Sequence, residues 1–332
     1  MQTKRLGRTG LEITRVGFGA WAIGGGDYAF GWGPQDDQDS IAAIARAVDL
    51  GMNWIDTAPV YGLGRSEEVV GRALEQIPAG RRPYVFTKCS LVWKDGSREV
   101  LHSLDPDSIR RECEASLRRL GVETIDLYQV HWARWTDVVD PSTDRLEDGW
   151  SALADLKKAG KVRHIGVSNF KVDDMERASR VAPVETLQPP YSLLRRKIEE
   201  EILPYCQAHD IGVIVYSPMQ AGILSGRMTR ERVEGFPEDD WRRRTREYQE
   251  PNLSRNLAFA DVLRTVGERH GRTAGEVAIA WTLRHPAVTA AIVGFRRAQQ
   301  VGEIAGAADL QLTGADVEEI ERAIPTVAPQ AS

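Results

Sequence analysis

Cysteine is scarce in this chain of 332 residues, where Cys89, Cys113 and Cys206 stand far apart and form no CxxC motif. An odd and scattered set excludes a disulfide framework and is typical of a reducing compartment. Apolar runs are also short, since none approaches the roughly 18 residues that a helix needs to cross a membrane. The first residues, MQTKRLGRTG, contain no apolar signal core. We therefore expect a cytoplasmic protein without a membrane span.

An excess of positive charge is absent too. The 43 Lys and Arg residues and the 48 Asp and Glu residues give a formal net charge of −5, which argues against nucleic acid as a partner. The 6 histidines show no metal-ligand spacing and no HExxH motif, so we expect no metal site. No GxSxG motif supports a nucleophile-elbow hydrolase. With 42% hydrophobic and 27% charged residues, the composition is that of an ordinary soluble globular protein.

What the chain does have is a regular alternation of short apolar runs with amphipathic helical segments. The predicted strands cover residues 16–19, 53–56, 84–88, 125–131, 162–168, 186–188, 212–216 and 289–294. The helices predicted between and after them cover residues 37–50, 66–74, 107–120, 146–159, 172–180, 199–208, 256–270 and 297–307. Crossover helices return the chain to the same edge of a sheet, so we expect parallel strands. Similar units without a linker favour a closed (β/α)8 TIM barrel of the α/β class over an open doubly wound sheet.

Other segments fall outside this alternation. Residues 4–6 and 11–13 flank a GRTG turn and predict an N-terminal β-hairpin. Residues 273–284 and 313–324 predict two extra helices beyond the barrel units. We expect one domain over residues 1–325, followed by a flexible tail at 326–332.

The glycine-rich stretch GFGAWA at residues 17–22 matches the GxGxxA pattern of dinucleotide-binding folds. That pattern needs a helix that begins within it, so that helix amides meet the pyrophosphate of the ligand. Further glycines at 24–26, 31 and 33, followed by Pro34, interrupt any helix here. We therefore reject a Rossmann fingerprint.

Titratable side chains stand where three neighbouring predicted strands end, at Asp56, Lys88 and His131. This end of a barrel carries the active site. A buried ammonium is costly without a partner, and Asp56 on the adjacent strand is the obvious partner of Lys88. Tyr61 follows Asp56 in DTAPVYG, on a loop expected to fold back over the barrel. The alternative interpretation is a structural ion pair, a core histidine and a surface tyrosine.

A series of motifs covers nearly the whole chain in the order DTAPVYG, GRSEEVVG, VFTKCS, IDLYQVHW, KAGKVRHIGVSNF, LQPPYSLL, VYSPMQAGILSG and VGFRRAQQVGEI. In these motifs the sequence resembles the aldo-keto reductase family, especially its long-loop bacterial branch of general-stress reductases and relatives of potassium-channel β subunits. The resemblance implies an NADPH-dependent oxidoreductase that reduces aldehydes and ketones to alcohols by hydride transfer. It places the catalytic tetrad on Asp56, Tyr61, Lys88 and His131.

Each member of this tetrad then has an expected role in carbonyl reduction. A nearby Lys88 ammonium is expected to lower the pKa of the Tyr61 phenol, which gives a proton to the product alkoxide. Asp56 holds Lys88 charged and in place. His131 is expected to donate a hydrogen bond that polarises the carbonyl oxygen of the substrate.

The resemblance also implies cofactor contacts at the same end of the barrel. They are Gly19, Ala20, Trp21 and Asp56 near the first strands; Ser168, Asn169 and Gln188 for the nicotinamide carboxamide; Tyr216 stacked on the nicotinamide; Ser217, Pro218, Gly222, Leu224 and Gly226 for the pyrophosphate; and Gly294, Arg296, Gln300 and Glu303 for the adenosine phosphates. A guanidinium at Arg296 is expected to grip the 2′-phosphate of NADPH or NADP+. Ile304 departs from the family pattern, in which many members carry asparagine for the adenine edge.

The substrate, the preferred reaction direction and the oligomeric state stay open at this stage. Four long segments, 24–35, 89–106, 132–145 and 217–255, follow the carboxyl ends of predicted strands. Those after the third, fourth and seventh strands are expected to shape the pocket. Aromatic lining for aldehydes or apolar ketones is indicated by Trp21, Trp93, Trp132 and Trp135. The basic stretch WRRRTR at 241–246 is interpreted either as a solvated loop or as a contact to cofactor phosphates. A nicotinamide-binding sensor or regulatory subunit with little turnover is the alternative function, since it keeps the same tetrad.

Overall fold

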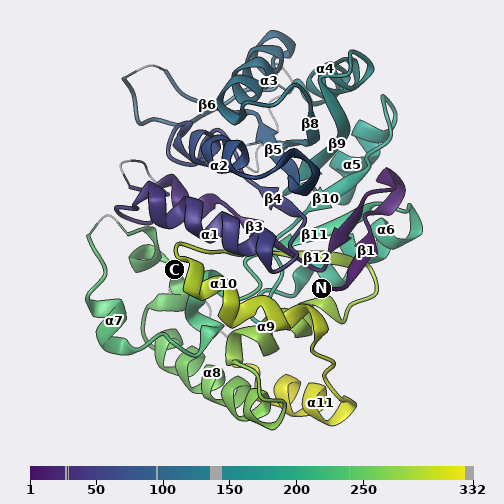
Figure 1. Ribbon diagram of the computed structural model, residues 1–332. Helices are drawn as coiled ribbons and strands as arrows, with labels where there is room; N and C mark the ends of the chain where they lie inside the picture. The colour runs from purple at the N-terminus through teal and green to yellow at the C-terminus, as the bar shows by residue number, and fades with distance from the viewer. Residues whose placement is uncertain (27, 29, 95, 135–143, 239, 326–332) are drawn as a thin grey trace.

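The computed structural model describes residues 1–26, 28, 30–94, 96–134, 144–238 and 240–325 (Figure 1). Its central strands are parallel and close into a barrel in the order β10-β11-β12-β3-β4-β5-β8-β9. They are β3 (Val16–Gly19), β4 (Trp54–Asp56), β5 (Tyr84–Cys89), β8 (Ile125–Val130), β9 (Val162–Ser168), β10 (Thr186–Gln188), β11 (Gly212–Tyr216) and β12 (Val288–Gly294). The predicted (β/α)8 TIM barrel is therefore confirmed. The tail predicted at 326–332 lies outside the described residues.

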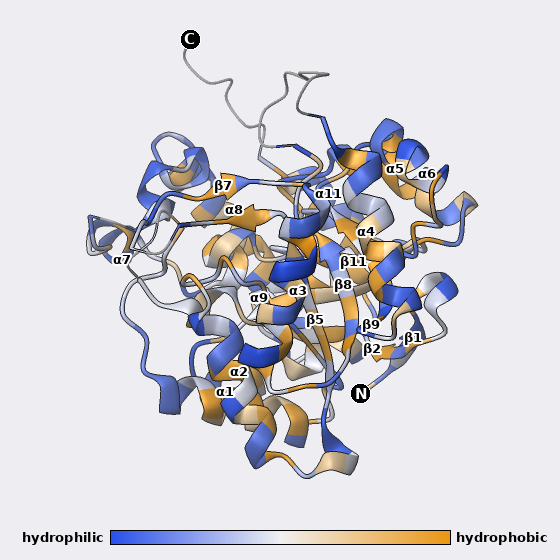
Figure 2. Cartoon of the chain, turned by 90° about the horizontal axis from the view of Figure 1, so that it is seen from above, coloured by the Kyte–Doolittle hydropathy of each residue, from blue (hydrophilic) through white to orange (hydrophobic). Residues whose placement is uncertain are grey.

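Helices surround the barrel, with apolar residues toward the strands and polar residues outward (Figure 2). They are α1 (Asp37–Asp49), α2 (Arg65–Gln76), α3 (Pro106–Leu120), α4 (Leu146–Lys158), α5 (Val172–Ser179), α6 (Ile202–Ala208), α7 (Arg230–Glu234), α8 (Asn252–Arg269), α9 (Ala274–Leu283), α10 (Ala298–Ile304) and α11 (Gly314–Ala323). Local sequence sets their ends. At α3, for example, the Asp105 carboxylate accepts the N–H groups of Asp107 and Ser108, and Gly121 ends the helix at φ 65°.

The helix that covers the last strand is not the predicted one. The sequence pattern favoured residues 256–270 as the crossover helix and placed 273–284 outside the barrel. In the structure every residue of α9 is buried and α9 contacts β12, whereas α8 packs against α9 from the outer side (Figure 1). A helix that is apolar on all sides is an inner helix, and that signal outweighs the stronger amphipathic pattern of α8.

The bottom of the barrel is closed by the predicted hairpin, whose strands are β1 (Thr3–Arg5) and β2 (Glu12–Thr14). Leu6 and Ile13 from this hairpin join the apolar cluster inside the barrel, and the Trp54 indole N–H donates to Thr14 O at 2.9 Å. Strand residues complete that apolar layer: Trp54, Phe86, Leu127, Ile214, Ala290 and Ile292.

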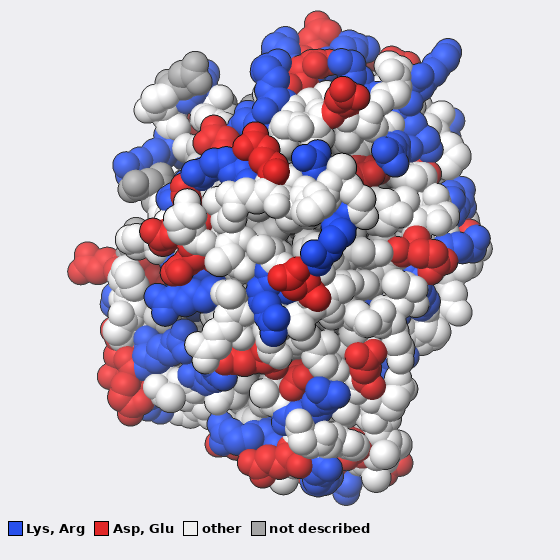
Figure 3. All heavy atoms as spheres, in the orientation of Figure 1, with Lys and Arg blue, Asp and Glu red and all other residues white. Residues whose placement is uncertain are grey.

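A polar layer lies above the apolar one. Because side chains two positions apart share a strand face, the barrel interior next receives Asp56, Lys88, Gln129, Gln188 and Tyr216. The layer is therefore built where sequence reasoning placed the site, at the carboxyl ends of the strands. On the outer surface, acidic and basic side chains are interspersed over the face seen in Figure 3. Each helix in the described ranges is too short or too polar to cross a membrane.

Candidate active site

Four titratable side chains meet above the barrel. Asp56 ends β4, Lys88 lies on the neighbouring β5, and His131 directly follows β8, the next strand around the barrel. Tyr61 lies on the loop after β4 and returns over the barrel mouth, so that its ring is 5.0 Å from Lys88 Nζ and 5.8 Å from the His131 ring. The structure thus brings together the four residues predicted as the tetrad.

The Lys88 ammonium is the hub of this group. Its side chain is fully buried, and its nitrogen donates to Asp56 Oδ1 at 2.6 Å, to Thr57 O at 2.9 Å and to Tyr61 Oη at 3.2 Å. An ammonium has three N–H donors, so every one of them is used. Burial lowers the pKa of Lys88 and the Asp56 carboxylate opposes that shift. The predicted ion pair is therefore present, and it also fixes the position of the phenol.

The protonation tendencies of Tyr61 and His131 differ from one another. Burial, reinforced by the negative charge of Asp56, raises the pKa of the Tyr61 phenol well above 10. The sequence led us to expect a lowered pKa. The shift is upward because the desolvation of the phenolate and its repulsion by Asp56 outweigh its attraction to Lys88. Burial and the nearby Lys88 charge lower the pKa of His131 well below 6.5. The site therefore holds a protonated phenol beside a neutral imidazole.

The second oxygen of Asp56 is held by two buried amides. Gln188 Nε2 donates to Asp56 Oδ2 at 2.8 Å, and Gln129 Nε2 donates to the same oxygen at 3.3 Å. Sequence reasoning singled out Gln188 and missed Gln129, although an amide two residues before His131 in the apolar run IDLYQVHW was a visible signal. Asp56 is thus fixed from both sides of its carboxylate.

Beside the tetrad, the residues predicted to contact a carboxamide form one hydrogen-bonded chain. Tyr216 Oη donates to Asn169 Oδ1 at 2.8 Å, and Asn169 Nδ2 donates to His131 O and Ser168 Oγ, each at 3.0 Å. Ser168 Oγ in turn donates to Gln188 O at 2.8 Å. Asn169 takes φ 58°, a left-handed conformation that asparagine tolerates better than most residues. These side chains are ordered by one another before any ligand arrives.

The predicted pyrophosphate segment follows β11 and bends sharply. Positive φ angles occur at Ser217 (57°), Gly222 (99°) and Gly226 (73°). Turns of this kind expose successive backbone N–H groups and form concave sites for anions. Pro218 and Leu224 are buried and anchor the segment. The N–H groups of Gly222 and Leu224 donate to Met219 O at 3.0 and 3.2 Å. The fit of this segment to a pyrophosphate therefore depends on its remaining N–H groups and on the Ser217 hydroxyl.

The predicted adenosine-phosphate residues lie at and beyond the end of β12. Gly294 pairs with Gly19 of β3, and a Cβ atom on Gly19 would approach Ile292 Cγ2 to 2.7 Å, so only glycine fits there. Gln300 Oε1 accepts the N–H groups of Arg296 at 2.8 Å and Arg297 at 3.1 Å and so caps α10.

Two ionic side chains in this region already have protein partners. The Arg296 guanidinium donates to Gln35 Oε1 at 2.6 Å, to Trp32 O at 3.2 Å and to the Pro34 carbonyl. Glu303 pairs with Arg227 at 2.8 Å, which joins α10 to the end of the pyrophosphate segment. Arg227 was not foreseen as part of the site.

An aromatic wall closes the other side of Tyr61. Ala20 N donates to Asp56 O at 2.8 Å, and the next residue, Trp21, stacks on Tyr61 at 6.1 Å and on Trp241 at 5.1 Å between ring centres. Arg242 pairs with Asp240 at 2.6 Å and lies 4.7 Å from the Trp32 ring centre.

The WRRRTR stretch therefore begins as part of this wall rather than as a solvated loop. Its first two residues are held by rings and by a buried carboxylate. Among the other tryptophans predicted for the pocket, Trp132 packs in one apolar cluster with Tyr61 and Trp93 is partly buried. Trp135 lies outside the described residues.

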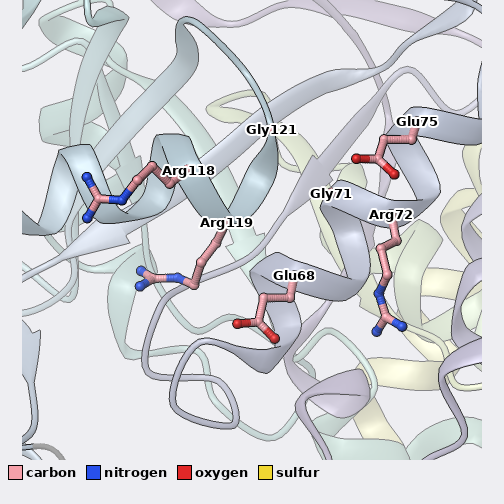
Figure 4. Close-up of a pocket in the computed structure, with 7 residues that line it drawn as sticks. All are labelled: Glu68, Gly71, Arg72, Glu75, Arg118, Arg119 and Gly121. Atoms are coloured by element: carbon pink, nitrogen blue, oxygen red, sulfur yellow. The ribbon is translucent and has the colours of Figure 1, made fainter.

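A charged groove lies elsewhere, between α2 and α3 (Figure 4). Its lining consists of Glu68, Gly71, Arg72, Glu75, Arg118, Arg119 and Gly121. Arg119 is engaged by the buried Glu67 at 2.7 Å and Arg72 by Asp37 at 2.6 Å. None of the predicted site residues lines this groove, so the candidate active site remains the polar layer above the barrel.

Comparisons with known proteins find similar sequences and structures over nearly the whole chain. A model of the aldo/keto reductase family matches residues 15–325. The chain is 36% identical over 321 residues to the Bacillus subtilis aldo-keto reductase YhdN, covering 96% of this chain and 92% of that protein. It is 35% identical over 322 residues to the NADH-specific methylglyoxal reductase of Escherichia coli, covering 94% of each. The structure of a glycerol dehydrogenase from Gluconobacter oxydans matches with a TM-score of 0.86 and 37% identity, over 100% of this chain and 98% of that one.

Proposed function

The chain belongs to the aldo/keto reductase family, and we propose that it reduces small aldehydes and ketones to alcohols with NADPH. The observation that carries this proposal is the contact of one buried ammonium with both an acid and a phenol. Lys88 Nζ lies 2.6 Å from Asp56 Oδ1 and 3.2 Å from Tyr61 Oη. A structural ion pair alone gives no reason for a tyrosine hydroxyl to share that ammonium.

The chemistry divides between cofactor and protein. NADPH, when bound, supplies a hydride to the carbonyl carbon. The chain supplies a proton from the Tyr61 hydroxyl to the carbonyl oxygen, which completes the alcohol. His131, kept neutral by burial, donates a hydrogen bond to the same oxygen and orients it. Lys88 holds the phenol oxygen in place and stabilises the phenolate that remains after the proton has left.

The raised pKa of Tyr61 is compatible with this role. A phenol with a high pKa is fully protonated at neutral pH, so the proton is present when it is needed. The alkoxide that forms on the substrate is a stronger base than a phenolate, and proton transfer to it is favourable. Tyr61 therefore acts as a general acid whose proton is held until negative charge develops on the substrate.

The residues of this chain fit a nicotinamide dinucleotide. Ser168, Asn169 and Gln188 offer donors and acceptors to a carboxamide, and Tyr216 offers a ring for stacking. The bent segment from Ser217 to Gly226 offers backbone N–H groups to a pyrophosphate. Gly294, Arg296, Gln300 and Glu303 are proposed for the adenosine half.

NADPH is favoured over NADH by the charge near Arg296. After the larger effect of burial, the charges of Arg242 and Arg297 lower the pKa of Arg296 and the Asp240 carboxylate opposes them, so positive charge gathers near this guanidinium. Such a positive region suits a 2′-phosphate, which NADH lacks. The Escherichia coli relative is named NADH-specific, and parallel titrations of this chain with NADPH and NADH test the choice.

Small polar carbonyl compounds are the proposed substrates. Methylglyoxal and glycerol appear in the names of two similar proteins, and the aromatic wall of Trp21 and Trp241 narrows the space beside Tyr61. The test is a panel of aldehydes and ketones, followed by the loss of NADPH absorbance. Turnover of several members supports the proposal. Tight NADPH binding without turnover of any member would replace it by the sensor function.

A further inference from the structure

We propose that Gln129 is a positioning residue of the active site. Its side-chain amide holds Asp56 and fixes the orientation of the Gln188 amide toward the cofactor. The proposal rests on the proposed function, because it concerns the nicotinamide end of the same site. It adds a residue outside the tetrad and outside the predicted cofactor contacts.

The contacts of Gln129 lie in the best-enclosed part of the barrel. Its side chain is fully buried on β8, next to Lys88 of β5 in the strand register. Nε2 donates to Asp56 Oδ2 at 3.3 Å, and Oε1 accepts from Gln188 Nε2 at 3.3 Å. Gln188 Nε2 also donates to Asp56 Oδ2 at 2.8 Å. The two amides and the carboxylate therefore close a triangle of hydrogen bonds.

This triangle allows only one orientation of the Gln188 amide. Both N–H donors of Gln188 are used, one by Asp56 and one by Gln129. A reversed amide would place its oxygen against the Asp56 carboxylate and against the oxygen of Gln129, which leaves buried acceptors facing each other. Within the described residues, Oε1 of Gln188 accepts no hydrogen bond. It is therefore free to accept an N–H from the nicotinamide carboxamide.

Packing alone does not explain a glutamine at this position. Leu127 lies two residues earlier on the same strand face, in the apolar layer, and is equally buried. An amide at 129 carries a desolvation cost that an aliphatic side chain would avoid. That cost is offset by the hydrogen bonds of the amide, and its partners are Asp56 and Gln188. The amide of Gln129 is therefore explained by its hydrogen bonds to the active-site residues Asp56 and Gln188, and not by packing.

The test compares Gln129→Met with the matched control Leu127→Met. Each places an unbranched apolar side chain on the same strand, but only the first removes the triangle. The probes are NADP+ and 2′-phospho-ADP-ribose, which shares the adenosine and pyrophosphate parts but lacks nicotinamide. For Gln129→Met we expect NADP+ binding to weaken about tenfold, the value of one lost hydrogen bond, and 2′-phospho-ADP-ribose binding to stay unchanged. Carbonyl turnover should fall by a similar factor, and Leu127→Met should change neither affinity.

The outcomes separate this inference from the proposed function. If the wild-type chain binds NADP+ and reduces carbonyl compounds, but Gln129→Met binds NADP+ as tightly as the wild type, the positioning role is wrong. Equal weakening of both probes would also overturn it, because such a loss is a general structural effect. If Gln129→Met does not fold, Gln129→Leu is measured in its place with the same expectations. A wild-type chain that binds no NADP+ would overturn the proposed function itself.

Discussion

Replacement of Tyr61 by phenylalanine is the sharpest test of the active site. The change removes one hydroxyl and keeps the ring that stacks on Trp21. In the structure that hydroxyl bonds to Lys88 Nζ at 3.2 Å, while the other two donors of Lys88 keep Asp56 and Thr57 O. One hydrogen bond to a buried charged group is lost, which should lower the free energy of unfolding by about 1.5–3 kcal/mol. The chain should still fold, and NADPH binding should be nearly unchanged.

Catalysis should change far more than NADPH binding. The product alkoxide loses its positioned proton donor, and general acid catalysis typically contributes about 10²–10⁴-fold. We therefore expect kcat for aldehyde reduction to fall by at least about a hundredfold, or about 2.7 kcal/mol in activation free energy. KM should change less, since His131 still meets the carbonyl oxygen. The assay is the initial rate of NADPH oxidation with each active aldehyde of the panel.

Tyr28→Phe provides the matched control. Tyr28 is also buried, and its hydroxyl accepts the Trp21 indole N–H at 2.9 Å rather than meeting Lys88. That indole N–H also reaches Phe30 O at 3.1 Å, so the control leaves it bonded. Tyr28→Phe should keep turnover within a few-fold of the wild type. If Tyr61→Phe reduces aldehydes at the wild-type rate, or if both variants lose activity equally, Tyr61 is not the proton donor.

Other expectations concern cofactor choice and stability. Arg296→Ala should weaken NADPH binding by about 1.5–3 kcal/mol and leave NADH binding nearly unchanged; equal losses in a fluorescence titration contradict the 2′-phosphate assignment. Lys88→Met should lower the free energy of unfolding by about 3–5 kcal/mol, because Asp56 stays buried without its counter-ion. In urea denaturation, the double variant with Asp56→Asn should recover part of this loss. If the losses of the two single variants simply add, the ion pair does not stabilise the fold. Burial raises the pKa of Glu112 from 4.5 to about 7, so the folded state binds this proton more tightly and stability falls as pH rises from about 4.5 to about 7. Glu112→Gln should remove up to about 3 kcal/mol of that pH dependence, and an unchanged slope would show that another group causes it.

Much of the site could be predicted because its residues obey local rules. Asp56 and Lys88 end apolar strands, and parallel strands of a barrel bring their carboxyl ends together. Once both are placed at that rim, burial requires that they pair. The barrel follows in the same way from the alternation of short apolar runs and amphipathic helices.

Contacts made by distant loops could not be predicted in this way. Trp241 meets Trp21 only because the segment after β11 folds back across the barrel mouth, and nothing local in WRRRTR specifies that path. The link between Arg296 and the Gln35 side chain joins residues 261 positions apart. The exchange of roles between α8 and α9 has a similar origin, since tertiary packing decides which helix lies inside. Gln129, in contrast, could have been predicted from the sequence, because side chains alternate along a strand and Leu127, two positions earlier, faces the barrel interior.

The pKa of Tyr61 shows why the placement of the tetrad residues did not yield their electrostatics. Sequence reasoning counted the attraction of Lys88 for a phenolate. It did not count that Lys88 is neutralised by Asp56 at 2.6 Å, so Tyr61 faces an ion pair rather than an isolated cation. The remaining field is weak compared with the desolvation of a buried phenolate, and the pKa rises. In the proposed mechanism, the benefit of Lys88 is therefore greatest late in the reaction, after Tyr61 has given up its proton. The phenolate then needs a positioned donor, and the Lys88 ammonium already lies 3.2 Å from that oxygen.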